Sequence, residues 1–276
     1  MAITAAAVNE LRKMTGAGMM DCKKALTEVD GDFEAAIDLL RKKGQKISAN
    51  RADRDATEGA VIALASADKT VGIIVRLSCE TDFVAKNSGF IALAENIAQI
   101  ALENKAADLV ALKALTIDGQ AISERLTEEM GKIGEKLDVS KYAIINGASV
   151  INYIHAGNRI GVLVELSLPA NDSISEAGRD VAMQIAAMNP VSVGEDDISA
   201  DVKERELEIG REQARAEGKP EQMIDKIAMG KLNKFYKENT LTKQAFVKDG
   251  SMTVEAMLKG IDGGLKVVSF SRIALG

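Results

Sequence analysis

The sequence has few of the residues that form disulfides, metal sites and membrane spans. Among its 276 residues are two cysteines and one histidine. Cys22 and Cys79 lie far apart and outside any CxxC spacing, which argues against a disulfide framework and a structural zinc site. No run approaches the roughly 20 apolar residues of a membrane-spanning helix. The start, Met1–Thr4, lacks a basic segment followed by an apolar one, so no secretory signal is expected. We therefore expect a cytoplasmic protein with no membrane contact.

Aromatic residues and positive charge are also scarce. Six phenylalanines, three tyrosines and no tryptophan leave few rings on which bases could stack. A formal net charge of −6 opposes general nucleic-acid binding, which rests on neutralising phosphates. The chain has instead eleven methionines, a residue that suits adaptable contact surfaces, although most methionines fill gaps in a core. No direct binding to nucleic acid is expected.

Residues 1–50 predict three short helices, separated by residues that begin or end helices. A unit of this size is small enough to be a docking module. The first helix runs from about Thr4 to Thr15 with Gly16 as its C-cap, the second begins near Asp21, and the third begins at Asp32 and ends before Gly44.

A polar linker and then a repeated pattern follow. Residues 51–58, within the polar stretch Ser48–Glu58, carry almost no apolar side chain. From Gly59, two apolar runs around a short turn predict a β-hairpin, and an amphipathic helix comes next. The same plan returns after residue 141. The apolar runs are Val61–Leu64, Val71–Leu77, Gly147–Ile154 and Arg159–Leu166, and the helices are Phe90–Leu102 and Ile174–Met188.

We predict an α+β fold whose core consists of two related subdomains. Residues 59–140 form the first, residues 141–188 with 238–276 form the second, and residues 189–237 are inserted as an antiparallel helical hairpin. Ten of the seventeen residues in 201–217 are charged, so the hairpin is expected to be a solvated arm. Its narrow apolar seam could close within one hairpin, or pair with a second copy to give a homodimer. The expected seam consists of Met223, Ile224, Ile227 and Phe235.

No part of the sequence resembles an assembled active site. The glycines at 16 and 18 have Asp21 where a dinucleotide fingerprint needs its third glycine, and no strand precedes them. They also fail as a phosphate loop, because no Gly-Lys-Ser/Thr follows at the required spacing. His155 lies at a predicted turn with no nucleophile suggested nearby. The residues favour a binding protein over an enzyme, with no catalytic residue, metal or cofactor expected.

Phe83 poses a separate question, because it follows Glu80, Thr81 and Asp82 where the apolar run to Leu77 ends. A ring that ends a strand usually folds inward. Asp82 beside it, however, would be costly to bury without a partner. The residues alone leave Phe83 either as a core residue or as a group offered to a partner.

Five segments carry a more specific signal. They are LRKMTGAGMMDCKKAL (11–26), CETDFVAKNSGF (79–90), HAGNRIGVLVEL (155–166), GKPEQMIDKIAMGKLNKF (218–235) and LTKQAFVKD (241–249). In this order, over nearly the whole chain, they resemble the bacterial elongation factor Ts family. The resemblance implies an N-terminal three-helix module like a ubiquitin-associated domain, two related core subdomains and an inserted helical hairpin.

The resemblance also implies a guanine-nucleotide exchange factor, which binds GDP-bound elongation factor Tu and promotes GDP release so that GTP can bind. In that family the loop matching Thr81, Asp82, Phe83 and Val84 enters the G domain of the partner and helps to dislodge Mg²⁺. The N-terminal module also touches the G domain. By motif match, the further contact residues here are Arg12, Met19, Met20 and His155.

Two other interpretations stay open on the residues alone. One is a small-molecule enzyme with a dispersed site on an α+β core, and the other is an RNA-associated module with the hairpin as its RNA arm. The single histidine and the missing phosphate loop weigh against the enzyme. The acidic balance and the mixed-sign hairpin weigh against the RNA arm.

Overall fold

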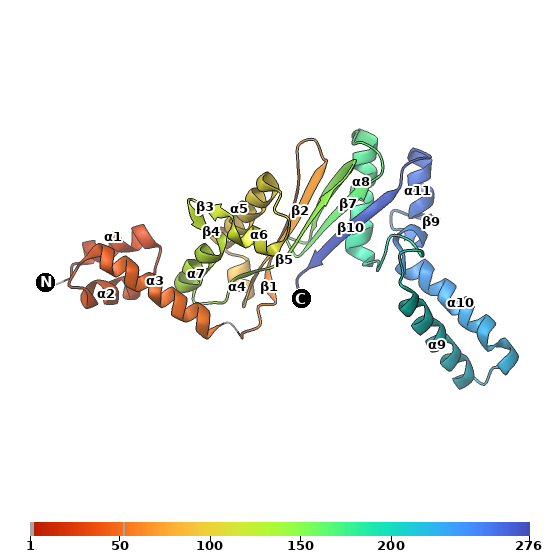
Figure 1. The fold of residues 1–276 in the computed structure, drawn as a ribbon, viewed down its shortest axis with the longest axis horizontal. Helices are drawn as coiled ribbons and strands as arrows, with labels where there is room; N and C mark the ends of the chain where they lie inside the picture. Colours follow the sequence, from red (N-terminus) through yellow and green to blue (C-terminus); the bar gives the residue numbers. More distant parts are fainter. Residues whose placement is uncertain (1–2, 52) are drawn as a thin grey trace. The chain divides into compact units, whose positions relative to one another are not determined.

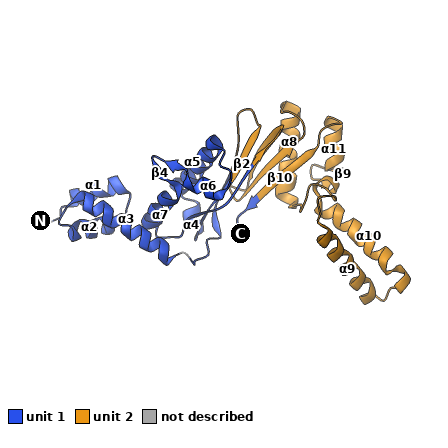
Figure 2. Cartoon of the chain, in the orientation of Figure 1, with its two compact units in different colours: residues 1–62, 75–144, 273–276 blue, residues 63–74, 145–272 orange. Residues whose placement is uncertain are grey.

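The computed structural model describes residues 3–51 and 53–276. It confirms the expected α+β fold, which combines helices with small sheets (Figure 1). The chain divides into two compact units (Figure 2). Unit 1 comprises residues 1–62, 75–144 and 273–276, and unit 2 comprises residues 63–74 and 145–272.

Three helices form the N-terminal part of unit 1. As expected, Gly16 ends the first with a left-handed φ of 69°, and Asp32 caps the third by accepting a hydrogen bond from the Ala35 N–H at 3.0 Å. The second begins at Met19, so Asp21 lies in its first turn and does not cap it. The helices are α1 (Ala5–Thr15), α2 (Met19–Glu28) and α3 (Phe33–Asn50), and their shared core contains Val8, Leu11, Ala17, Cys22, Ala25, Leu26 and Ala36.

The prediction that helix α3 ends before Gly44 is wrong, because the helix continues to Asn50. The polar residues from Ser48 onward are therefore helical at first. Gly44 faces helix α7 (Ile122–Ile133), and a Cβ added to Gly44 would lie 3.1 Å from the carbonyl oxygen of Thr127. A glycine in a helical pattern often marks the helix end, whereas here its missing side chain lets two helices approach each other.

Three strands form a sheet with the order β1-β2-β5. Every residue of the central strand β2 is buried, as its position between two neighbours requires. The strands are β1 (Glu58–Ala65), β2 (Val71–Cys79) and β5 (Asp138–Asn146). Between β2 and β5 lie α4 (Asp82–Ala85), α5 (Ser88–Asn104), α6 (Leu109–Ala114), the paired strands β3 (Thr116–Ile117) and β4 (Gln120–Ala121), and α7.

Unit 2 repeats this plan, in agreement with the internal similarity of the sequence. Strands β6 (Ser149–His155) and β7 (Ile160–Leu166) pair antiparallel, and helix α8 (Asp172–Met188) packs on both. Strand β10 (Val267–Ala274) completes a sheet with the order β10-β7-β6. In both sheets the last strand thus lies beside the second strand of the hairpin. The core of unit 2 includes Ile151, Val162, Val164, Leu166, Ile174, Val181, Ile185, Leu241, Phe246, Val254, Leu258 and Val267.

The inserted hairpin consists of α9 (Ala200–Ala216) and α10 (Glu221–Asn239), which pack against each other (Figure 1). Its seam differs in part from the predicted one, because Met223 is 45% exposed. Gly210 lets the helices meet at Ala228, since a Cβ on Gly210 would lie 3.0 Å from the Ala228 Cα. The buried residues of α10 therefore recur every four positions, and the middle one, Ala228, is small. Its buried residues are Gly210, Ala214, Ile224, Ala228 and Leu232, while Ile227 and Phe235 are half-buried.

A short connection returns the chain from the hairpin to the sheet of unit 2. The buried Gln184 of α8 holds it, because its amide donates to the carbonyl of Ala245 at 3.1 Å and accepts from the Val247 N–H at 2.8 Å. The connection comprises the 3₁₀ turn η1 (Leu241–Lys243), the paired strands β8 (Ala245–Phe246) and β9 (Asp249–Thr253), and α11 (Val254–Ile261).

A buried arginine joins two distant parts of the sequence in unit 1. Arg76 on β2 donates from Nη1 to the carbonyl of Ala274 at 3.0 Å and from Nη2 to the carbonyl of Thr57 at 2.9 Å. Its Nε donates to Ser78 Oγ at 3.0 Å. Burial lowers the pKa of Arg76. These three acceptors replace the water that the guanidinium loses on burial.

Candidate functional site

The loop after β2 presents Phe83 to solvent. Phe83 is 84% exposed, so the ring is not part of the core. It lies in the one-turn helix α4, which Thr81 caps by accepting a hydrogen bond from the Val84 N–H at 3.4 Å. Asn87 caps the next helix in the same way, through the Gly89 N–H at 2.8 Å. The loop is therefore a short ordered segment between two caps that carries an exposed ring.

Thr81 is held by Glu135, which follows the end of α7. The Thr81 N–H donates to Glu135 Oε2 at 3.0 Å, and the Thr81 hydroxyl donates to Oε1 at 2.6 Å. Gly134 ends α7 with a left-handed φ of 79° and so turns the chain just before Glu135. Sequence reasoning missed Glu135, because it lies 54 residues from Thr81 and no local pattern connects the two.

Glu80, on the other side of Thr81, joins the loop to residues beyond the end of α3. Its carboxylate accepts from Arg51 Nη1 at 2.5 Å, from Arg54 Nη1 at 3.4 Å and from the Lys136 N–H at 2.6 Å. Burial alone raises the pKa of Glu80, but the Lys136 N–H and Arg51 outweigh it and hold the pKa below its ordinary value. Glu80 is thus a carboxylate at neutral pH.

Two titratable side chains in and near the loop, Asp82 and Cys79, have shifted pKa values. Lys86 donates to Asp82 at 2.6 Å and lowers the pKa of that carboxyl, so the residue before Phe83 carries a carboxylate at neutral pH. Burial, together with the carboxylates of Glu135 and Glu58, raises the pKa of Cys79 to about 12. The Cys79 thiol therefore stays protonated and is a poor nucleophile. An exposed apolar ring and a carboxylate in the same loop suit binding to a partner protein.

The expected contact residues of the N-terminal helices are also exposed. Met19 and Met20, at the start of α2, are 51% and 63% exposed, and Arg12 on α1 is exposed as well. The two methionines thus do not fill the core of the three helices. Flexible, polarizable side chains at the surface are typical of adaptable contacts.

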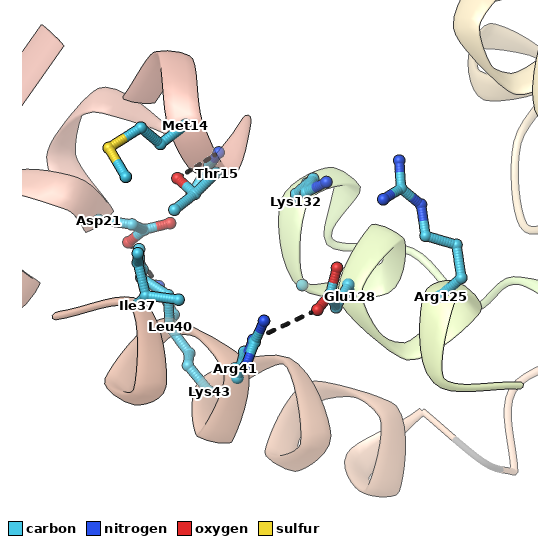
Figure 3. Close-up of a pocket in the computed structure, with 12 residues that line it drawn as sticks. Met14, Thr15, Asp21, Ile37, Leu40, Arg41, Lys43, Arg125, Glu128 and Lys132 are labelled. Carbon is cyan, nitrogen blue, oxygen red and sulfur yellow. Dashed lines mark hydrogen bonds and ion pairs between the residues drawn. The ribbon is translucent and has the colours of Figure 1, made fainter. Parts of the chain in front are cut away.

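A cleft of about 230 Å³ lies between these helices and α7 (Figure 3). Arg41 of α3 forms an ion pair with Glu128 of α7 at 3.5 Å along one side. Lys43 pairs with Asp21, and Lys132 pairs with Glu129 at 2.9 Å. Its cations thus have nearby carboxylates, and the apolar part of its wall consists of Met14, Ala17, Ile37 and Leu40.

His155 belongs to unit 2, at the end of β6. It is exposed, and its Nδ1 lies 2.9 Å from the Tyr153 hydroxyl. The two rings are tilted, with centroids 5.8 Å apart. The turn that follows has a positive φ at Ala156, Gly157 and Asn158, which places His155 at a tight hairpin. His155 is thus available for a contact at the tip of this hairpin.

The structure therefore gathers the predicted residues into three places. Thr81, Asp82, Phe83 and Val84 share one loop, Arg12, Met19 and Met20 lie on α1 and α2, and His155 lies in unit 2. In the part of the chain that the structure describes, no group of three or more His, Cys, Asp and Glu side chains could hold a metal ion. Within residues 3–51 and 53–276, no helix has the length and apolar character needed to cross a membrane.

Known proteins resemble this chain over its full length. It is 53% identical to elongation factor Ts of Christiangramia forsetii over 99% of both chains, and 54% identical to that of Cytophaga hutchinsonii over 99% of both. It is 52% identical to elongation factor Ts of Amoebophilus asiaticus over the whole of both chains. The family model described as elongation factor TS matches residues 80–276. The chain belongs to the elongation factor Ts family, a family of translation elongation factors.

Proposed function

We propose that this protein is a cytoplasmic guanine-nucleotide exchange factor, which binds elongation factor Tu in its GDP-bound form and promotes GDP release. Phe83 carries the proposal, because an exposed ring stands on an ordered, capped loop in a chain of this family. A large aromatic side chain that fills a pocket of a partner is a typical anchor of an interface.

The physical basis is linkage between two binding events. A GTPase holds GDP through backbone amides around the phosphates and through Mg²⁺, which bridges phosphate and protein. When the ring of Phe83 inserts into the G domain, it favours a conformation that cannot hold Mg²⁺, while Asp82 makes polar contacts beside it. GDP binding is thereby weakened, and GDP weakens binding of the exchange factor by the same ratio. Exchange of this kind needs no catalytic side chain.

A second requirement is surface away from the nucleotide that sustains the complex. Arg12, Met19 and Met20 supply it on the N-terminal helices, and His155 supplies it in unit 2. The hairpin serves assembly and not nucleotide release, since its dense charge suits a solvated arm and both of its helices carry exposed apolar side chains, at Ile209, Met223 and Met229.

The test is the release of a fluorescent GDP from elongation factor Tu, with excess unlabelled GDP and increasing amounts of this protein. Release should accelerate with concentration and then saturate. No acceleration at any concentration would contradict the proposal. A second measurement is size-exclusion chromatography with nucleotide-free elongation factor Tu, where failure to co-elute would return weight to the enzyme and RNA interpretations.

A further inference from the structure

We propose that Glu135 is a positioning residue for Phe83: it fixes the orientation of helix α4 through Thr81, and so the direction in which the ring is offered to a partner. This inference rests on the proposed exchange function. It assigns a role in that function to a residue outside the loop itself.

The exposed ring of Phe83 cannot orient itself. Because Phe83 is 84% exposed, its ring has few contacts of its own. Its direction must come from the backbone of α4, a helix of only four residues. Such a helix is too short to be stable alone, because nucleation of a first turn is unfavourable. Something outside the helix must therefore hold it.

A chain of hydrogen bonds leads from helix α4 to Glu135. The Thr81 hydroxyl donates to Glu135 at 2.6 Å and also accepts from the Val84 N–H at 3.4 Å. The Thr81 N–H donates to the second carboxylate oxygen at 3.0 Å. Two bonds from one carboxylate to one residue fix its rotation as well as its position. The orientation of α4 is thereby set through Thr81.

The segment that carries Glu135 is itself held in place by hydrogen bonds and packing. The residue after Glu135 holds the residue before Thr81, because the Lys136 N–H donates to Glu80 at 2.6 Å. Glu135 and Lys136 thus hold Thr81 and Glu80, respectively. Glu135 follows helix α7, which is anchored by the buried side chains of Ile122, Leu126 and Met130. A binding group held by a packed element keeps its geometry better than one held by a free loop.

The chemistry explains why the holding group is a carboxylate. Both groups of Thr81 that face Glu135 are donors, so the best partner has two acceptor oxygens and no donor. Glutamine has the same shape but no charge. Its single oxygen can accept from the Thr81 N–H, and its NH₂ group can bond the Thr81 hydroxyl only if that hydroxyl accepts in place of donating. Glu135→Gln therefore removes the charge and one of the two acceptor oxygens with little change in volume, which makes it a selective variant.

The first measurement uses the free protein and does not depend on exchange activity. Amide hydrogen exchange at Thr81 and Val84, followed by NMR, should be faster in Glu135→Gln by about tenfold, as expected for the loss of a charge-assisted hydrogen bond. The matched control is Glu124→Gln, which removes an exposed carboxylate from the first turn of α7, the helix that precedes Glu135, and should leave these amides unchanged. Unchanged Thr81 and Val84 amides in Glu135→Gln would overturn the proposal.

The second measurement is GDP release from elongation factor Tu. Glu135→Gln should lower kcat about tenfold and leave KM almost unchanged, because the docking surfaces stay intact while the ring is misdirected. Glu124→Gln should match the unmodified protein. If Phe83→Ala slows release and Glu135→Gln does not, the positioning role is wrong while the exchange function stands. If Phe83→Ala has no effect either, the exchange mechanism itself fails, and the amide measurement still decides whether Glu135 holds the loop.

A third variant protects the test against a folding defect. Thr81→Val removes the hydroxyl on the other side of the same bond and should also lower kcat. The double variant Thr81→Val/Glu135→Gln should be less impaired than the two separate losses combined, since both remove one interaction. Losses that multiply fully would mean that Glu135 acts by some route other than Thr81, and would overturn the proposal.

Discussion

Gly44 and Gly131 mark the closest approach of helices α3 and α7. A Cβ added to Gly131 would lie 2.9 Å from the Cα of Gly44, a separation that forces the backbone to move. The ion pair between Arg41 and Glu128 lies near this contact, at 3.5 Å. The glycine pair thus sets how closely the N-terminal helices rest against α7, the helix whose end carries Glu135.

Gly131→Ala should separate α3 from α7. Overpacking at a tight contact costs about 1–3 kcal/mol, more than the gain of ~1 kcal/mol expected from alanine in a helix. We expect a lower Tm and faster amide exchange on the contacting faces of both helices. Gly230→Ala is the matched control, because Gly230 is an exposed helical glycine with nothing within 4 Å of a new Cβ. A Tm for Gly131→Ala at or above that of the unmodified protein would contradict the account.

Phe83→Ala should slow GDP release without loss of stability. A buried aromatic anchor contributes about 2 kcal/mol or more to an interface, which corresponds to a loss of at least roughly tenfold in rate at fixed concentrations. The free variant should keep its Tm, since the ring is exposed before binding. A large fall in Tm with unchanged release per folded molecule would show that the ring belongs to the core.

Replacing both Met19 and Met20 with alanine should weaken docking and not the release step. KM for elongation factor Tu should rise by about tenfold, and kcat should change little, since the two side chains act away from the loop. Met188→Ala, which removes a methionine of similar exposure from the end of α8, is the control. Equal KM values for the double variant and this control would show that Met19 and Met20 are not part of the binding surface.

Glu80 should make the stability of the protein depend on acidity. Its pKa is below the ordinary value of 4.5 in the folded protein, so the folded state binds this proton less tightly than the unfolded chain. The stability that Glu80 contributes is therefore present above about pH 4.5 and is lost as the pH falls through the lower folded pKa. Glu80→Gln should lower Tm at pH 7, and the two melting curves should converge in acid. A difference in Tm that stays constant from pH 7 to pH 3 would contradict this.

Removal of residues 211–226 shortens both helices of the hairpin by equal amounts. We expect a change in oligomer size or in the stability of the complex with elongation factor Tu, as measured by light scattering. The kcat for GDP release should be largely retained, because the Phe83 loop is untouched. Complete loss of exchange with a normal complex would assign the hairpin a direct part in nucleotide release.

The local signals of the sequence predicted local structure well. Asp32 and Gly16 mark helix ends because the cap needs only a side-chain oxygen, or a residue that accepts a positive φ. The repeated hairpin and helix of the core were also visible, since burial imposes its own periodicity on each copy. The exposure of Phe83 was the less common outcome for a ring at the end of a strand, and the family resemblance was what favoured it.

The features that the sequence did not predict depend on contacts between segments that lie far apart in the chain. Gly44 resembles a helix end until Gly131 is known to lie against it, and Ala228 belongs to the seam because Gly210 faces it. Glu135 is one acidic residue among many in the sequence. Only the folded chain shows that its two oxygens face the two donors of Thr81.

The bonds of Arg76 have a consequence for the order in which the chain folds during synthesis. Its acceptor at Ala274 lies 198 residues further along the sequence. At roughly 5–20 residues per second, a ribosome needs about 10–40 s to add that stretch. Until then the guanidinium lacks the Ala274 carbonyl, one of its three acceptors, and its burial without that acceptor costs free energy. Unit 1 is thus completed only after residues 273–276 have been made.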